Sequence, residues 1–169
     1  KATIKLNVKK IPLQVKKSTA AVKVVSMTEG DGIASWKSSN KKVAAVTSKG
    51  KITGKKAGTA KITVTLKSGI SASVTVKVQK KAVTTTKLSV TGKSLKKNKL
   101  TLKKGKSVTL TAVRTPITST EKITYQSSNK KIAAVTSKGK VTGKKPGKAK
   151  ITVKSGKKKV TISVTVKKK

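Results

Sequence analysis

The sequence predicts an all-β protein built from two small sandwich domains in tandem, and three observations predict it. Residues 38–64 return 89 positions later as residues 127–153, with 23 of 27 aligned positions identical. Apolar and polar residues alternate along the segments that follow, as they do in half-buried strands. No segment carries apolar residues at the helical spacing i, i+3, i+4, i+7. Such a repeat is one structural unit used twice, so we expect domains at residues 1–80 and 84–169.

The repeated segment is expected to hold short strands joined by glycine turns. The apolar run Val43–Val46 precedes the turn Ser48–Lys51, in which Gly50 is free to adopt a positive φ. A second turn runs from Gly54 to Gly58, between the fifth and sixth strands of such a sandwich. The strand that follows alternates cleanly and is expected to bury its apolar face, namely Ile62, Val64 and Leu66.

The rest of the first copy supplies the remaining strands. The region Lys1–Lys17 contains Pro12, which has no N–H to donate and therefore marks a sheet edge or a switch between sheets. Val22–Ser26 is expected to be the next strand, and Ile33–Lys37 the one after it. The linker Gln79–Thr86 has neither Gly nor Pro, so we expect little hinge freedom and an elongated pair.

A series of motifs appears in the same order in both copies. An aromatic residue, Trp36 or Tyr125, precedes a Ser-Ser-Asn triplet and a short Ala-Ala-Val strand. A Gly-Lys-Ile/Val-Thr-Gly hairpin and a Lys-Ile-Thr-Val strand follow. This order resembles the bacterial immunoglobulin-like domain, group 2. The resemblance implies two tandem immunoglobulin-like β-sandwiches of the seven-stranded type, with Trp36 and Tyr125 at equivalent core positions.

The second copy also has the upstream strand pair of that family, Leu100–Gly105 followed by Val108–Ala112. The first copy departs from the pattern, because Ser18 or Thr19 stands where the glycine is expected. The family has no catalytic motif. The resemblance therefore implies a non-catalytic structural or adhesion module of a bacterial cell-surface or secreted protein.

The composition argues against an enzyme. The chain has no His and no Cys, so the commonest general base, the commonest metal ligand and thiolate chemistry are all missing. Its three carboxylates are Glu29, Asp31 and Glu121. The Glu29–Gly32 loop is expected to be a plain turn, because Ca²⁺ takes roughly six to eight oxygen ligands. We expect no catalytic residue, no cofactor and no metal.

The charge is extreme, with 44 basic residues against 3 acidic ones and a net charge of +41. Arg114 is the only arginine, and two explanations of the lysine excess stay open. It is either a solvated coat or a surface that binds polyanions, and even a coat attracts polyanions at low salt. The candidate contacts are lysine pairs that recur in both copies: Lys41, Lys42, Lys55, Lys56, Lys130, Lys131, Lys144 and Lys145.

These observations lead to an expected partner and location. The expected partner is an acidic cell-wall or host polysaccharide, bound by a monomeric rod outside the cell or on the bacterial surface. Specific nucleic-acid binding is not expected, since the only rings are the core residues Trp36 and Tyr125. Membrane insertion is not expected either. Because the chain starts at Lys1 without Met, we expect a mature product or a fragment.

Two alternative functions stay open at this point. One is a passive spacer that presents an attached catalytic or carbohydrate-binding domain. The other is a non-specific nucleic-acid binder.

Overall fold

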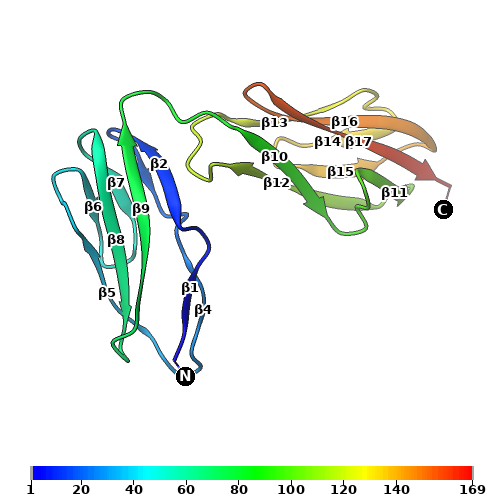
Figure 1. Cartoon of the computed structure of the whole chain (residues 1–169). Coiled ribbons are helices and arrows are strands. Elements are labelled where there is room, and N and C mark those ends of the chain that lie inside the picture. Colours follow the sequence, from blue (N-terminus) through cyan, green and yellow to red (C-terminus); the bar gives the residue numbers. More distant parts are fainter. Residues whose placement is uncertain (1, 169) are drawn as a thin grey trace. The chain divides into compact units, whose positions relative to one another are not determined.

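The computed structural model describes residues 2–168, and every regular element within them is a β-strand, which confirms the all-β prediction (Figure 1). The chain divides into unit 1, residues 1–83 with 116–119, and unit 2, residues 84–115 with 120–169. Lys1 and Lys169, the outer ends of the expected domains, lie outside the described residues.

Unit 1 is built from three small sheets. Their strand orders are β2-β9-β8-β5, β3-β7-β6 and β1-β4. Among the described residues of this unit, only the β2–β9 pair is parallel. The strands are β1 (Ile4–Leu6), β2 (Lys10–Gln14), β3 (Ser18–Thr19), β4 (Val24–Met27), β5 (Ile33–Ser38), β6 (Ala44–Val46), β7 (Ile52–Gly54), β8 (Gly58–Leu66) and β9 (Ser71–Gln79).

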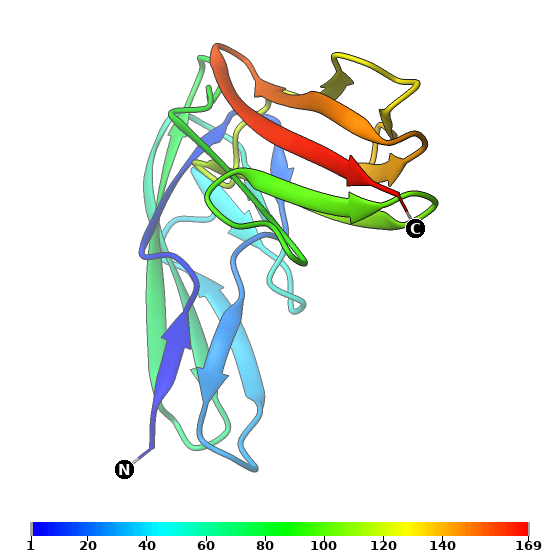
Figure 2. The same cartoon turned by 90° about the vertical axis from the view of Figure 1, so that its right-hand side faces the viewer.

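Unit 2 is built from two four-stranded sheets. Their orders are β10-β12-β15-β14 and β11-β17-β16-β13, and β11 pairs in parallel with β17. The long hairpin of β16 and β17 is clearest in Figure 2, in orange and red. The strands are β10 (Lys87–Gly92), β11 (Lys99–Lys103), β12 (Ser107–Thr115), β13 (Ile123–Ser127), β14 (Ala133–Val135), β15 (Lys140–Gly143), β16 (Gly147–Ser155) and β17 (Lys158–Lys167).

Both units exceed the expected seven strands. In each unit the first strand is split between two sheets, which makes eight, and in unit 1 an interruption between β3 and β4 adds a ninth. In unit 1 the chain leaves β1, which pairs with β4, and enters β2, which pairs with β9. Pro12 lies in β2, at the edge of its sheet, where a residue without an N–H is tolerated. The prediction that Pro12 marks an edge is confirmed, whereas the switch between sheets lies before β2, at residues 7–9.

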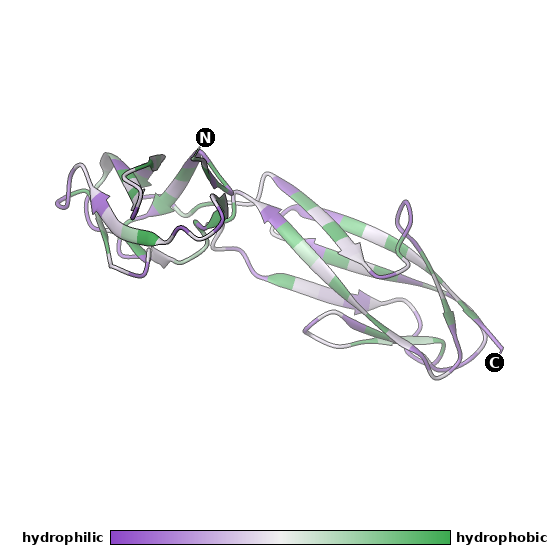
Figure 3. Ribbon diagram, turned by 90° about the horizontal axis from the view of Figure 1, so that it is seen from below, coloured by the Kyte–Doolittle hydropathy of each residue, from purple (hydrophilic) through white to green (hydrophobic). Residues whose placement is uncertain are grey.

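The cores follow from the two-residue period of the long strands. Ile62, Val64 and Leu66 on β8 are at most 1% exposed, which confirms the expected buried face. Their counterparts on β16, Ile151 and Val153, are fully buried. Figure 3 shows the resulting alternation of hydrophilic and hydrophobic bands along the strands. Each core is therefore made almost entirely of aliphatic side chains that project inward from alternate positions.

One strand of unit 1 differs from its prediction. The strand expected at Val22–Ser26 is β4, Val24–Met27, and residues 20–23 separate it from β3. Unit 2 has the continuous strand β12 at this place. Ser18 pairs with Thr53 as Ser107 pairs with Thr142, but the next buried residue, Val22, comes one position later than Leu110 does. In a continuous strand, a shift by one residue would turn the side chain of Val22 from the core to solvent. The hydrogen-bonded ladder is therefore interrupted, and Val22 stays buried.

The glycine expected at Ser18 or Thr19 is a second correction. The counterpart of Gly105 is Lys16, which also lies in the left-handed region, with φ of 65° against 83°. Lys16 donates its N–H to Gly54 O at 2.8 Å, and Gly105 donates to Gly143 O at 2.7 Å. The turn geometry is thus retained with a lysine. A residue with a Cβ raises the conformational free energy of this left-handed turn by about 1 kcal/mol relative to glycine.

Candidate functional site

The repeated Ser-Ser-Asn-Lys-Lys motif folds into a turn held by its own side chains. In unit 1 Ser38 Oγ donates to Ala44 O at 2.6 Å and accepts the N–H of Asn40 at 3.1 Å. Asn40 Oδ1 accepts the backbone N–H groups of Lys42 and Val43. Side-chain bonds of this kind fix the turn between β5 and β6, with Lys41 and Lys42 exposed on it. Unit 2 repeats the arrangement with Ser127 and Asn129 between β13 and β14.

The second lysine pair of each unit is brought against the first. Lys55 and Lys56 lie in the turn between β7 and β8, and both donate their N–H groups to Val43 O, at 2.8 and 3.3 Å. In unit 2 Lys144 and Lys145 donate to Ile132 O at the same two distances. The structure therefore gathers the four candidate lysines of each unit at one end of its sandwich.

Further lysines at these ends were missed by sequence reasoning. Gly54 accepts from Lys16 and donates to Lys17 O at 3.0 Å, so the β2–β3 turn joins the same end. Gln14 Nε2 donates to Lys80 O, which adds the residues after β9. In unit 2 Gly143 N donates to Lys106 O at 3.0 Å, and Lys104 N donates to Lys167 O at 2.9 Å. The signal was weak, because these contacts depend on a parallel edge pairing between distant segments.

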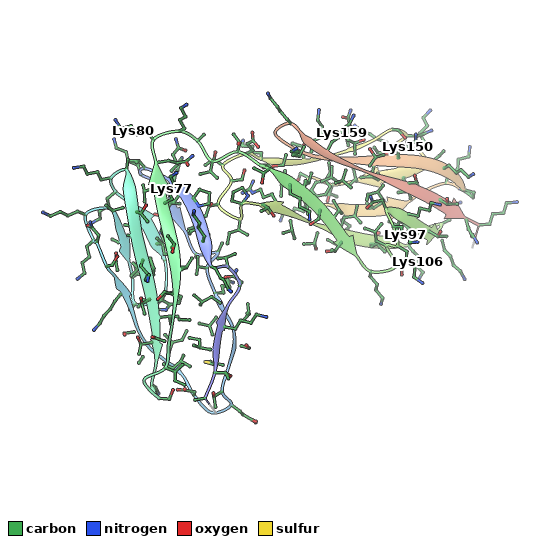
Figure 4. The ribbon with its side chains drawn as sticks, in the orientation of Figure 1. Lys77, Lys80, Lys97, Lys106, Lys150 and Lys159 are labelled. Atoms are coloured by element: carbon green, nitrogen blue, oxygen red, sulfur yellow. The ribbon has the colours of Figure 1, made fainter. Side chains whose placement is uncertain are left out.

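We call these groups the basic ends. The side chains in both are exposed, and Figure 4 labels Lys80 in unit 1 and Lys106 in unit 2. The basic end of unit 1 consists of Lys16, Lys17, Lys41, Lys42, Lys55, Lys56 and Lys80. The basic end of unit 2 consists of Lys104, Lys106, Lys130, Lys131, Lys144, Lys145 and Lys167.

All three carboxylates lie at the opposite end of their units. Asp31 and Glu29 lie in the loop before β5, and Asp31 binds Ser68 in the turn after β8. Glu121 precedes β13 and accepts the N–H of Thr85 at 2.6 Å. The nine residues of β8 span the unit from one end to the other, which is roughly 30 Å. No carboxylate side chain of residues 2–168 therefore neutralises either basic end.

The lysines of the basic ends have the chemistry that multivalent anions require. Clustered exposed ammonium groups raise the local positive potential, and each supplies three donors as a point charge. Within residues 2–168 no group of three or more His, Cys, Asp or Glu side chains is placed to hold a metal ion. Both carboxylate oxygens of Asp31 accept hydrogen bonds, from the N–H groups of Gly32 and Ser68 and from the hydroxyl of Ser68.

Those contacts set the acid strength of Asp31. The hydroxyl of Ser68 and the N–H of Gly32 donate to its carboxylate and lower its pKa below the ordinary value of 3.8. A lowered folded pKa contributes stability above the unfolded pKa, and this contribution is lost as the pH falls through the folded pKa. Replacing Ser68 by Ala is expected to raise the pKa of Asp31 toward 3.8.

An NMR pH titration of the Asp31 carboxyl carbon measures this effect. The matched control is Ser48→Ala, another exposed turn serine of unit 1, which should leave the pKa of Asp31 unchanged. An Asp31 pKa that does not move in Ser68→Ala would contradict the assignment of the hydrogen bond as its cause.

Several solved structures match the chain at low sequence identity. The S-layer protein SbsC, domains 5-6, is 17% identical over 97% of each chain, with a TM-score of 0.46. The larger fragment rSbsC(31-844) is 22% identical, with a TM-score of 0.40, and this chain covers only 22% of its length. A fragment of intimin in complex with its translocated receptor is 16% identical over 98% of this chain and 64% of its own, with a TM-score of 0.38.

The sequence itself places the chain in a known family. No curated protein matches the sequence. Among the described residues no helix is long and apolar enough to cross a membrane. The profile of the bacterial Ig-like domain (group 2) matches residues 1–78 and again residues 89–169, which together are most of the chain. The chain therefore belongs to the bacterial Ig-like domain (group 2) family.

Proposed function

We propose that this chain is a non-catalytic module of a bacterial cell-surface or secreted protein and that it binds acidic polymers at its basic ends. The observation that carries the proposal is that a lysine-rich end recurs in both units, without an Asp or Glu side chain of residues 2–168 beside it. The same backbone hydrogen bonds build it twice, from Val43 in unit 1 and from Ile132 in unit 2. The family membership supports a role as a structural or adhesion unit.

The chemistry of lysine defines the class of ligand. An ammonium group is a point charge without the planar fork of arginine, so it attracts phosphates and carboxylates without reading their surroundings. A polymer with regularly spaced anions gains from several such groups at once and releases its counterions. The expected ligands are polyglycerol phosphate and acidic polysaccharides, with DNA bound non-specifically.

The experiment compares two variants with equal net charge. The basic-end variant replaces Lys55, Lys56, Lys144 and Lys145 by Gln. The control variant replaces four exposed lysines outside the basic ends by Gln, namely Lys37, Lys67, Lys157 and Lys158. Each loses four of the 41 net charges, so a uniform coat predicts equal losses.

Binding to polyglycerol phosphate, polygalacturonate and DNA is measured at about 0.15 M salt. The basic-end variant is expected to bind at least about tenfold more weakly than the wild type, with a shallower salt dependence. The control variant should stay within about twofold. Equal losses in both variants would favour the lysine coat, and no binding by the wild type at this salt concentration would leave the passive spacer.

A further inference from the structure

A groove with a volume of about 510 Å³ opens on unit 1, away from its basic end. One side is formed by Val22, Lys23, Val24 and Met27, and the other by Ile33 and Trp36. Lys49, in the turn between β6 and β7, lies on its rim. This volume is in the range of sites that hold a small molecule or a short stretch of peptide.

The groove exists because the strand between β3 and β4 is interrupted. In unit 2 the continuous strand β12 closes the same side, since Leu110 N donates to Gly139 O at 2.8 Å. Gly50 is the counterpart of Gly139, and no such bond reaches it within residues 2–168. A Cβ at Gly139 would lie 2.5 Å from Leu110 O, whereas at Gly50 its nearest neighbours are all atoms of Trp36. The extra residue in unit 1 thus leaves space beside Trp36.

Trp36 was expected at a core position, and the structure places it at the boundary of the core. Its ring packs against the core and against Gly50, but the side chain is only partly buried and lines the groove. Its indole N–H has no hydrogen-bond partner among residues 2–168, and no buried side-chain nitrogen or oxygen of these residues lacks one. The N–H therefore reaches solvent, where it is available to a ligand.

The strands beside the groove also expose an unusual amount of apolar surface. Val25, Met27 and Ile33 are 55%, 40% and 42% exposed, and they are three of the four large exposed apolar residues among residues 2–168. Exposed apolar patches of this kind mark interaction sites. β5 is the edge of its sheet and β4 pairs only with β1, so both strands bordering the groove have unpaired backbone groups. Unpaired edges accept an additional strand.

The groove also carries its own charges. Lys23 and Lys49 are exposed and form no ion pair among residues 2–168, and the acidic residue nearest in sequence to Ile33, Asp31, is engaged by Gly32 and Ser68. The groove has aliphatic walls, one aromatic ring, two lysine ammonium groups and open strand edges. A peptide can use all of these features, whereas a sugar would need many hydrogen-bonding side chains. We propose that this groove binds an extended peptide segment in which apolar residues alternate with Asp or Glu.

The bound segment adds a strand along β5. Its apolar side chains enter between β4 and Trp36, and its carboxylates pair with Lys23 and Lys49. Alternation is required because successive side chains of a strand point to opposite faces. This site is independent of the proposed binding of polymers at the basic ends.

Trp36 reports on the groove directly, because it is the only Trp in the chain. The probe is an acetylated and amidated peptide of about seven residues in which Glu alternates with Leu. Titration with it is expected to shift the fluorescence of Trp36 to shorter wavelength in a saturable way. The variant with Lys23→Gln and Lys49→Gln should bind about tenfold more weakly, and so should the variant with Met27→Ser and Ile33→Ser.

Unit 2 supplies the matched controls. Lys138→Gln removes the lysine equivalent to Lys49, and Val113→Ser removes an apolar side chain that is 47% exposed. Both should bind the peptide like the wild type. The basic-end variant should also keep the peptide site, which separates this proposal from the proposed function.

Three results would overturn the proposal. An equal response to polyglutamate would mean that charge alone binds, and a stronger response to polygalacturonate would mean that the occupant is an acidic saccharide. An equal loss in the Lys138→Gln control would mean that the peptide binds outside the groove.

Discussion

Replacing Gly139 by Ala is expected to lower the free energy of unfolding of unit 2 by about 3–4 kcal/mol, whereas Gly105→Ala lowers it by about 1 kcal/mol. Both glycines have a φ of 83°, so the backbone strain of a Cβ is the same at both positions. At Gly105 a Cβ meets nothing within 4 Å. At Gly139 it would lie 2.5 Å from Leu110 O and 2.9 Å from Tyr125 Cζ. The backbone carbonyl moves only if the bond between Leu110 N and Gly139 O is disturbed.

Urea unfolding of unit 2, followed by the fluorescence of Tyr125, measures both variants, because this is the only Tyr in the chain. The difference between the two variants isolates the close packing of the turn on the ring and the neighbouring strand. Equal losses in Gly139→Ala and Gly105→Ala would contradict that packing.

The second large effect concerns the independence of the two units. Ile151 is fully buried on β16, and replacing it by Ala removes apolar contacts and leaves a cavity. The expected cost to unit 2 is about 3–4 kcal/mol, or a fall in its melting temperature of about 15–25 °C. Unit 1 has its own aliphatic core, so its melting temperature should not change.

The reciprocal variant, Ile62→Ala, is the control, since Ile62 occupies the equivalent buried position on β8. It should lower the melting temperature of unit 1, which is followed by Trp36 fluorescence, and leave the melting temperature of unit 2 unchanged. If either substitution lowered both transitions together, the chain would unfold as one cooperative body and the expected division at residues 80–84 would be wrong.

The strands that alternate over many residues were predictable from the sequence. A nine-residue strand such as β8 has one face buried in the core, and only one register puts Ile62, Val64 and Leu66 there. The Ser-Ser-Asn turn was also predictable as a turn, because its bonds are local. The edge position of Pro12 followed from the missing N–H alone.

The interruption at residues 20–23 was not predictable. It arises from a single extra residue with no glycine or proline to mark it, and only the pairing of Ser18 with Thr53 reveals the shift. The turn at Lys16 was also not predictable, because a residue with a Cβ rarely adopts a positive φ and lysine gives no sign of such a turn in the sequence.

Some features of the candidate sites were predictable from the sequence and others were not. The eight candidate lysines could be named from the repeat, and the turns of Lys55 and Lys144 could be placed. Their convergence with Lys16, Lys17 and Lys80 depends on contacts between segments far apart in sequence. The groove beside Trp36 was missed because it follows from the interrupted strand.

The central claim is that anions gather at the basic ends and are not spread over the lysine coat. Its most direct test is a titration of the ¹⁵N-labelled protein with short inorganic polyphosphate at about 0.15 M salt, followed by amide chemical shifts. The predicted result is that the largest shifts fall at residues 16–17, 41–43 and 54–56 and at their counterparts 104–106, 130–132 and 143–145. Shifts of equal size at exposed lysines elsewhere, such as Lys37, Lys67 and Lys157, would contradict it.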